Sequence, residues 1–557
     1  MTKTGPFRTC WTSLGAEAAW IARRLPAFIM LALAGCSCGP AIVALSGGRQ
    51  PPECLEGPPP PTPDASRSTQ ENQSPPPRTL PGALHAYCRC LRYCPPVRDI
   101  EPSKTQGSET GTSKNGDGDK DEDKAYGEDN SSGPEENSAN KDKEKYKEGW
   151  CSAHAQGTVI TQKHSRFQSP YSAFNSLPPV EPFVTSDTAT AFLAARLWDG
   201  GELVFNPEVA GGKGFGNAVT GIANYPNQEI TRVGIEEPTP YIARLYLRQT
   251  FGFGGEQEKV EDGANQIAGS RDISRLTISV GKMGATDIVD DNLYSHDSRT
   301  SFLPWAMVYN GAWDYPANVR GYTYGVAFDL NQKDWTLRYG LFAVARFANS
   351  APLDPHLLRA NGHVVELETR YTLDGHPGKL RLLGYLNLAH MGKYSEAIAE
   401  MPVNPDITLT RAYRIKYGFG FNLEQELTKD LGAFARFGWD DGHTETWMFT
   451  EIDTTFLLGL TLKGRCWCRP QDQLGLALAL NGLSSQHRDY LAAGGLGFII
   501  GDGRLNYGLE KTLEAYYSLE VRKGLYFALD LQGVDHPAYN KDRGPVFIVS
   551  GRMHIEF

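Results

Sequence analysis

The chain has 557 residues, a formal net charge of −10 and a mean hydropathy of −0.40. The acidic balance argues against a nucleic-acid binder, which needs a basic surface. No run of about 20 apolar residues follows residue 35, so no spanning helix is expected there. A membrane β-barrel has the same average polarity, because half of each strand faces a polar lumen.

Residues 1–36 resemble an export signal. Arg23 and Arg24 precede an apolar stretch of about ten residues that ends at Ala34, and small residues follow. Residues 33–36, Leu-Ala-Gly-Cys, also resemble a lipoprotein signal, which implies a lipid on Cys36. Ordinary cleavage nearby is the alternative, and the sequence leaves both open.

Residues 37–150 are predicted to be a disordered linker. The segment is first rich in proline, and from Lys104 to Lys147 it is charged and nearly free of apolar side chains. Such a composition buries too little apolar surface to offset the entropy lost on ordering. Its partner could be peptidoglycan or a periplasmic protein.

Residues 151–557 consist of strand-length runs separated by Gly, Pro, Asn and Asp turns. They predict an all-β fold, a transmembrane antiparallel β-barrel of about 16 strands. The expected strands are 154–162, 189–198, 202–210, 241–251, 273–283, 320–330, 335–347, 364–373, 379–391, 411–425, 431–440, 451–464, 473–481, 514–522, 525–532 and 545–557.

Alternation along these runs favours a membrane barrel over a soluble sandwich. In 525–532, Leu525, Phe527, Leu529 and Leu531 alternate with Tyr526, Ala528, Asp530 and Gln532. In 414–424, charged residues, glycines and one asparagine alternate with apolar residues. Side chains on a strand point alternately to its two faces. Short turns also alternate with long connections such as 211–240 and 284–319, as in outer-membrane barrels.

A barrel of this size holds an aqueous channel whose selectivity depends on side chains at its constriction. Arginine forks, carboxylates and aromatic faces together suit neutral sugars. Residues 284–319 are expected to fold into the pore. The candidate constriction residues are Glu208, Arg244, Tyr246, Arg248, Arg275, Trp313, Asp314, Arg338 and Arg436. Structural ion pairs within the lumen are the alternative role for these arginines.

Several motifs resemble one family, the carbohydrate-selective porins (OprB-like outer-membrane porins). They are Asn206-Pro207-Glu208, Gly221-Ile222-Ala223, Pro238-Thr239-Pro240-Tyr241-Ile242-Ala243-Arg244, Tyr294-Ser295-His296-Asp297 and Trp313-Asp314-Tyr315-Pro316. The resemblance covers residues 153–557 and implies a 16-stranded barrel in the outer membrane of a Gram-negative-type bacterium. It further implies passive diffusion of mono- and small oligosaccharides past an arginine- and glutamate-bearing eyelet. The linker is a departure from the family pattern.

Two other function classes remain open. A barrel enzyme, an esterase or protease, would need a nucleophile and a base, and Ser295, His296 and Asp297 are the only tempting set. A secreted glycan-binding β-domain would show similar alternation. The sequence predicts no enzyme, no cofactor and no metal site, small carbohydrates and membrane lipid as partners, and a monomer or a homotrimer.

Overall fold

The computed structural model describes residues 149–217 and 220–557. The predictions for the export signal, and for all but the last residues of the linker, lie outside this part of the chain. None of the helices in the two described ranges is both long and apolar enough to cross a membrane.

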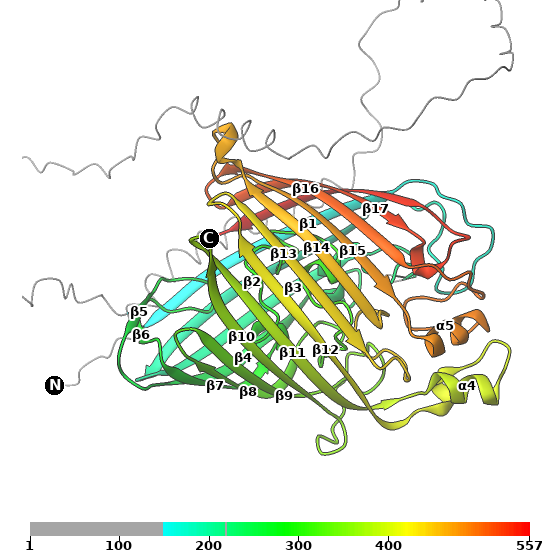
Figure 1. Cartoon of the computed structure of the whole chain (residues 1–557), viewed down its shortest axis with the longest axis horizontal. Helices are drawn as coiled ribbons and strands as arrows, with labels where there is room; N and C mark the ends of the chain where they lie inside the picture. Colours follow the sequence, from blue (N-terminus) through cyan, green and yellow to red (C-terminus); the bar gives the residue numbers. More distant parts are fainter. Residues whose placement is uncertain (1–148, 218–219) are drawn as a thin grey trace, which may run out of the picture.

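Within these described ranges, sixteen strands form one closed antiparallel barrel, which confirms the predicted fold class (Figure 1). Each strand pairs with its sequence neighbour, except that β4 pairs with β7 and the barrel closes between β1 and β18. The barrel strands are β1 (Cys151–His164), β2 (Val184–Trp198), β3 (Gly201–Gly212), β4 (Thr239–Gly252), β7 (Arg275–Met283), β8 (Thr323–Asn331), β9 (Trp335–Ala343), β10 (Asn361–Leu373), β11 (His376–Met391), β12 (Ala412–Glu426), β13 (Leu431–Asp440), β14 (Thr454–Lys463), β15 (Gln473–Gly482), β16 (Glu510–Arg522), β17 (Leu525–Asp535) and β18 (Val546–Glu556).

The wall of the barrel is apolar outside and polar inside. On β17, the Leu529 side chain is 53% exposed, whereas its neighbour Asp530 is fully buried. On β12, Ile415 and Phe419 are exposed, and Lys416 between them is fully buried. This is the inverse of a soluble sandwich, and it is the pattern that a lipid-facing wall around a polar lumen requires.

The two ends of the barrel differ. The chain turns tightly at the end where the C-terminus lies, for example at 374–375 and 523–524, and the long connections are at the other end, beside α4 and α5 (Figure 1). One connection at the short-turn end is long: residues 253–274 form a two-stranded hairpin, which the sequence did not predict. The hairpin and the helical turns are β5 (Gln257–Val260), β6 (Gly269–Asp272), α3 (Trp305–Val308), α4 (Tyr394–Glu400), α5 (Ser485–Ala492), η1 (Gln228–Arg232), η2 (Ala285–Asp287), η3 (Ile407–Thr410), η4 (Gly464–Trp467) and η5 (Pro537–Tyr539).

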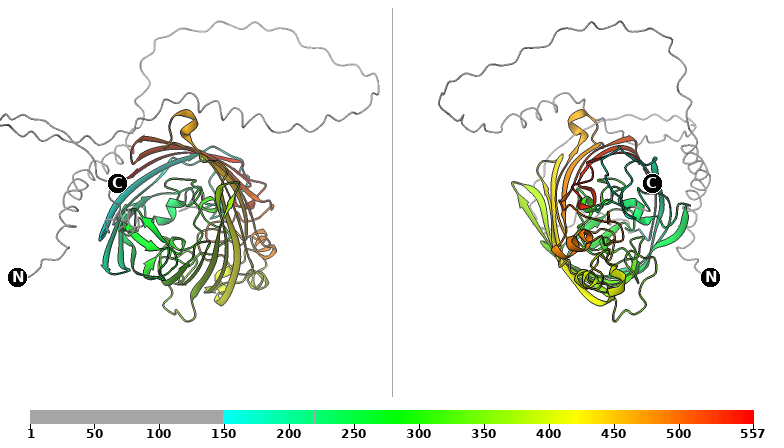
Figure 2. Two further views of the ribbon diagram at one scale, coloured as in Figure 1. Left: turned by 60° about the vertical axis from the view of Figure 1, so that its left-hand side comes forward. Right: turned by 90° about the vertical axis from the view of Figure 1, so that its right-hand side faces the viewer.

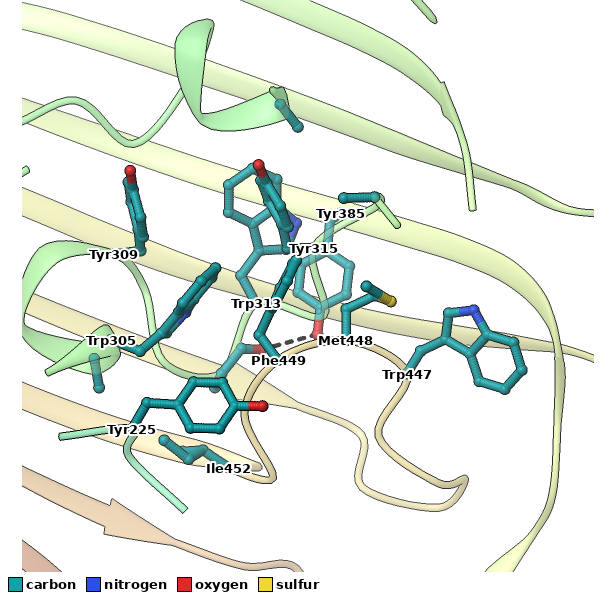
Figure 3. Packing of buried hydrophobic residues seen from close by; sticks show 14 of the residues in the cluster. Tyr225, Trp305, Tyr309, Trp313, Tyr315, Tyr385, Trp447, Met448, Phe449 and Ile452 are labelled. Atoms are coloured by element: carbon teal, nitrogen blue, oxygen red, sulfur yellow. Dashed lines mark hydrogen bonds between the residues drawn. The ribbon is translucent and has the colours of Figure 1, made fainter. Parts of the chain in front are cut away.

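Residues 284–322, here called the inner segment, connect β7 to β8 through the interior of the barrel. The views toward the two ends show this green stretch inside the ring of strands (Figure 2). The apolar side chains of this segment pack in an aromatic cluster. The Trp305 and Phe449 rings stack with their centroids 4.4 Å apart, and the centroids of the Tyr315 and Phe449 rings lie 5.1 Å apart (Figure 3). The expectation that 284–319 enters the barrel is therefore confirmed.

Candidate functional site

A cavity of about 1010 Å³ occupies the half of the lumen nearest the short turns. Its wall is built from inward-facing side chains of β2 to β4 and β7 to β11, closed on one side by the inner segment and on another by the β5–β6 hairpin. We call this cavity the vestibule. Carboxylates line it in the same number as lysine and arginine side chains, so their formal charges cancel.

Several wall charges of the vestibule form direct pairs. Arg248 on β4 donates from Nη2 to Glu202 Oε2 at 2.6 Å, and from Nε to the same oxygen at 3.0 Å. Arg338 on β9 donates to Asp329 and Glu366, both at 2.8 Å, and to Glu368 at 3.2 Å. Each guanidinium is thereby fixed in position, because a planar fork bound to carboxylates on neighbouring strands cannot rotate freely.

Arg244 lies deeper than Arg248 and pairs with the inner segment. Its Nε and Nη2 donate to the two carboxylate oxygens of Asp287 at 2.7 and 2.6 Å. Burial raises the pKa of Asp287, but the Arg244 guanidinium, the Gly284 N–H and the Arg232 charge together outweigh this and hold that pKa below its ordinary value. The Tyr322 ring lies 5.3 Å from the Arg244 guanidinium carbon, so the arginine also contacts an aromatic face.

Glu208 is the centre of a buried polar cluster rather than a free acceptor. It accepts hydrogen bonds from Thr190 at 2.6 Å and from the Tyr241 and Tyr322 hydroxyls, and Arg299 lies at 3.4 Å. The same arginine donates to Glu229 at 2.9 Å, and Glu229 also accepts from Arg232. The cluster joins the barrel wall to the 213–238 connection and to the inner segment.

Trp313, Asp314 and Arg436 belong to the packing of the inner segment. The Trp313 ring is buried edge-on against Tyr315, with centroids 5.2 Å apart. Asp314 accepts from the backbone N–H groups of Trp447 and Met448 at 2.9 and 2.7 Å. Burial raises the pKa of Asp314, and the Lys416 ammonium at 3.5 Å and these N–H groups only partly offset it.

Arg436 on β13 reaches three points of the same segment. It donates to the Ser295 carbonyl at 2.7 Å, to the Asp290 carboxylate at 3.1 Å and to the Met307 carbonyl at 3.3 Å. Since the guanidinium is fully buried, these acceptors replace its water shell.

The structure thus places Tyr246, Arg248, Arg275 and Arg338 on the vestibule, with Arg244 beside it, and places Glu208, Trp313, Asp314 and Arg436 behind the lining. Sequence reasoning missed Arg232, Arg299 and Tyr322, which complete the Glu208 cluster. Arg232 and Arg299 lie outside strands, where no alternation assigns a side chain to the lumen. Tyr322 lies within the expected strand 320–330 but just before β8, which begins at Thr323. Only their place in charged or aromatic stretches could have marked them.

The serine and histidine considered for an enzyme do not form a pair. The Ser295 hydroxyl donates to the Met307 carbonyl, and the His296 ring packs edge-on against Tyr309 at 5.4 Å. Among the described residues, no group of three or more His, Cys, Asp and Glu side chains is arranged to hold a metal ion.

Comparison with known structures finds the same fold. The high-pH structure of Pseudomonas putida OprB matches with a TM-score of 0.55 and 15% identity, over 73% of this chain and 94% of that one. Its low-pH structure matches over 73% and 93%, with 14% identity and a TM-score of 0.39. The outer-membrane channel DcaP of Acinetobacter baumannii matches over 73% and 97%, with 8% identity and a TM-score of 0.42.

A search of curated proteins finds no match for this chain. The family model described as "Carbohydrate-selective porin, OprB family" matches residues 190–557, which include β3 to β18 and the whole inner segment. The chain therefore belongs to the OprB family of carbohydrate-selective porins, and its barrel is that of an outer-membrane channel.

Proposed function

We propose that this porin gives passive, substrate-biased diffusion of mono- and small oligosaccharides through its lumen. The observation that carries the proposal is the vestibule wall, where cations and carboxylates are equal in number and several form direct ion pairs, such as Arg248 with Glu202 and Arg338 with Asp329. Paired charges produce little net field along the path, so an ion gains little by entering. A neutral polyol can still accept from guanidinium N–H groups and donate to carboxylate oxygens.

The residues of the site divide into two roles under this proposal. Arg248, Arg275 and Arg338 offer donors to the solute, and the Tyr246 ring offers a face for the C–H side of a pyranose. The buried residues behind the lining do not contact the solute and instead hold the wall and the inner segment in place; they are Glu208, Trp313, Asp314 and Arg436. No bond is made or broken, so the proposal requires no catalytic residue.

Replacing Arg248 by alanine tests the proposal. The variant loses the Arg248–Glu202 pair and leaves the Glu202 carboxylate with Arg196, at 3.8 Å, as its cationic partner. We expect the relative permeation of different hexoses to change more than the conductance in potassium chloride, because one hydrogen-bonding site is lost while the pore size changes little. Liposome swelling with sugars, amino acids and salts of matched size measures the first, and planar bilayers measure the second.

The control for this experiment is Lys429→Ala, which removes an exposed charge in the short turn before β13. Its sugar preference should equal that of the parent. If the parent passes sugars, amino acids and salts of matched size equally well, it is a general porin and the sugar bias is refuted.

A further inference from the structure

The connection between β4 and β7 is far longer than barrel closure requires. Other connections at the short-turn end are 199–200, 332–334, 374–375, 427–430, 464–472 and 523–524, whereas this one is 253–274. Gly252 lies directly opposite Arg275 in the β4–β7 ladder. A two-residue turn could therefore join these strands, as it does in ordinary hairpins. The additional residues build the β5–β6 hairpin instead.

The hairpin is docked against the barrel mouth rather than extended into solvent. Its tip contacts the start of β1: the Ser152 hydroxyl donates to the Gly263 carbonyl at 3.0 Å, and His154 lies 3.2 Å from the Asp262 carboxylate. Val260 and Ile267 are buried beneath it. Contacts to β1 on one side and to β4 on the other fix the hairpin across this part of the opening.

The hairpin also holds two arginines of the vestibule. The Asn265 carbonyl accepts from Arg248 Nη2 at 2.9 Å, and the Asn265 side-chain oxygen accepts from Asn206 at 2.7 Å. Asn265 has a φ of 61°, a left-handed conformation that asparagine adopts more readily than most residues. The hairpin thus occupies a donor of Arg248 that would otherwise point toward solute.

The second arginine is bound through a carboxylate. Glu258 on β5 accepts from Arg271 at 2.9 Å and lies 3.0 Å from the Arg275 guanidinium. Glu258, Gln257, Gln266 and Arg271 all line the vestibule. A solute that has passed the inner segment therefore meets polar side chains of the hairpin before it leaves by the short-turn end.

We infer that the β5–β6 hairpin is a second filter of this porin, located at the short-turn mouth and separate from the constriction at the inner segment. It limits the size of the solute at that end and sets how many donors Arg248 and Arg275 present. The inference rests on the proposed function for its solute, but its size limit can be measured with any neutral or ionic probe.

The test replaces residues 253–274 of the full chain by Asn-Gly, which joins Gly252 to Arg275 in register. In planar bilayers the conductance in potassium chloride should rise roughly twofold or more, because the pore is wider at one mouth. In phosphatidylcholine liposomes the largest permeant member of a series from mono- to tetrasaccharide should be larger than for the parent. A mobility shift on boiling before electrophoresis verifies that the barrel has folded.

Two point variants accompany the replacement. Ile267→Asn places a polar group in the buried contact beneath the hairpin, and it should raise conductance in the same direction by a smaller factor. Lys429→Ala, in the 427–430 turn and away from the vestibule lining, should match the parent. If the replacement variant does not fold, Ile267→Asn decides the question.

The outcomes separate the filter from the proposed function. A parent that shows no sugar bias refutes the proposed function, and the conductance of the hairpin variants still tests the filter. The filter is refuted if the parent prefers sugars and the hairpin variants keep the conductance and size limit of the parent. That result does not contradict the proposed function.

Discussion

The buried carboxylate of Asp314 connects three parts of the molecule. It belongs to the inner segment, accepts from two backbone N–H groups of the 441–453 connection, and lies 3.5 Å from the Lys416 ammonium on β12. Lys416 is fully buried and also lies 3.4 Å from Asp440. Its charge is therefore shared between the inner segment and the wall.

Asp314→Ala should destabilise the folded barrel. It leaves the N–H groups of Trp447 and Met448 without an acceptor and removes one partner of a buried ammonium, which together cost about 3 kcal/mol. Urea unfolding in detergent micelles, followed by tryptophan fluorescence, measures the difference. Asp314→Asn keeps an acceptor oxygen and should lose less. An alanine variant as stable as the parent would show that the carboxylate does not anchor the segment.

At the scale of elements, the inner segment is held from several strands by buried arginines. Arg436 on β13 binds two of its carbonyls and Asp290, and Arg552 on β18 donates to the Ser298 and Ser301 carbonyls, both at 2.5 Å. Carbonyl groups of an irregular segment need such donors, because no ladder satisfies them in the interior.

Arg436→Ala should loosen the inner segment and leave the barrel intact. The carbonyls of Ser295 and Met307 lose their shared donor, so the segment samples other positions and the single-channel current becomes noisier and larger on average. Planar-bilayer recording measures this change, and Lys429→Ala serves again as the matched control. Recordings that cannot be distinguished from the parent would contradict a positioning role for Arg436.

At the scale of the whole molecule, the exterior is matched to lipid. Leu529, near the middle of β17, is exposed on the outer face and flanked in the ladder by Tyr517 and Gly551. Leu529→Arg should lower the free energy of unfolding in lipid by about 2–4 kcal/mol, because it places a charge near the bilayer midplane. Refolding into liposomes across a urea series tests it. Leu529→Ile should have little effect, and equal stability of the arginine variant would place this face outside the membrane.

The number of strands, and which side chains point outward, could be predicted from the sequence because alternation is a local signal. The apolar Leu529 is expected on the outer face and the charged Asp530 on the inner face from their residue types alone. Strand ends were less well predicted: β2 begins at Val184 instead of residue 189, since residues 185–188, Thr-Ser-Asp-Thr, are polar on both faces and show no apolar alternation. The β5–β6 hairpin was missed, because its polar residues 256–262 show no apolar alternation.

The site could be predicted only where it lies on strands. Alternation on β4 and β9 put Arg248 and Arg338 inside the barrel, and both line the vestibule. Alternation could not separate these arginines from Arg436. The Arg436 side chain also points into the barrel, but it is covered by the inner segment and does not line the vestibule. Whether an inward-facing side chain reaches the open lumen depends on how the connections fold into the barrel, which strand alternation does not encode. Contacts such as that of Arg299 with Glu229 join residues that no sequence period relates.

Barrel closure brings together residues at opposite ends of the folded sequence. The His154 ring on β1 donates from Nδ1 to the Phe557 carbonyl across a separation of 403 residues, whereas every other seam joins barrel strands that are consecutive in the chain. Until β18 is available, the growing sheet has two free edges, and bare backbone amides are not tolerated in hydrocarbon. Insertion into lipid therefore requires either that β18 is already paired with β1, or that an assisting protein pairs with the free edges until the barrel closes.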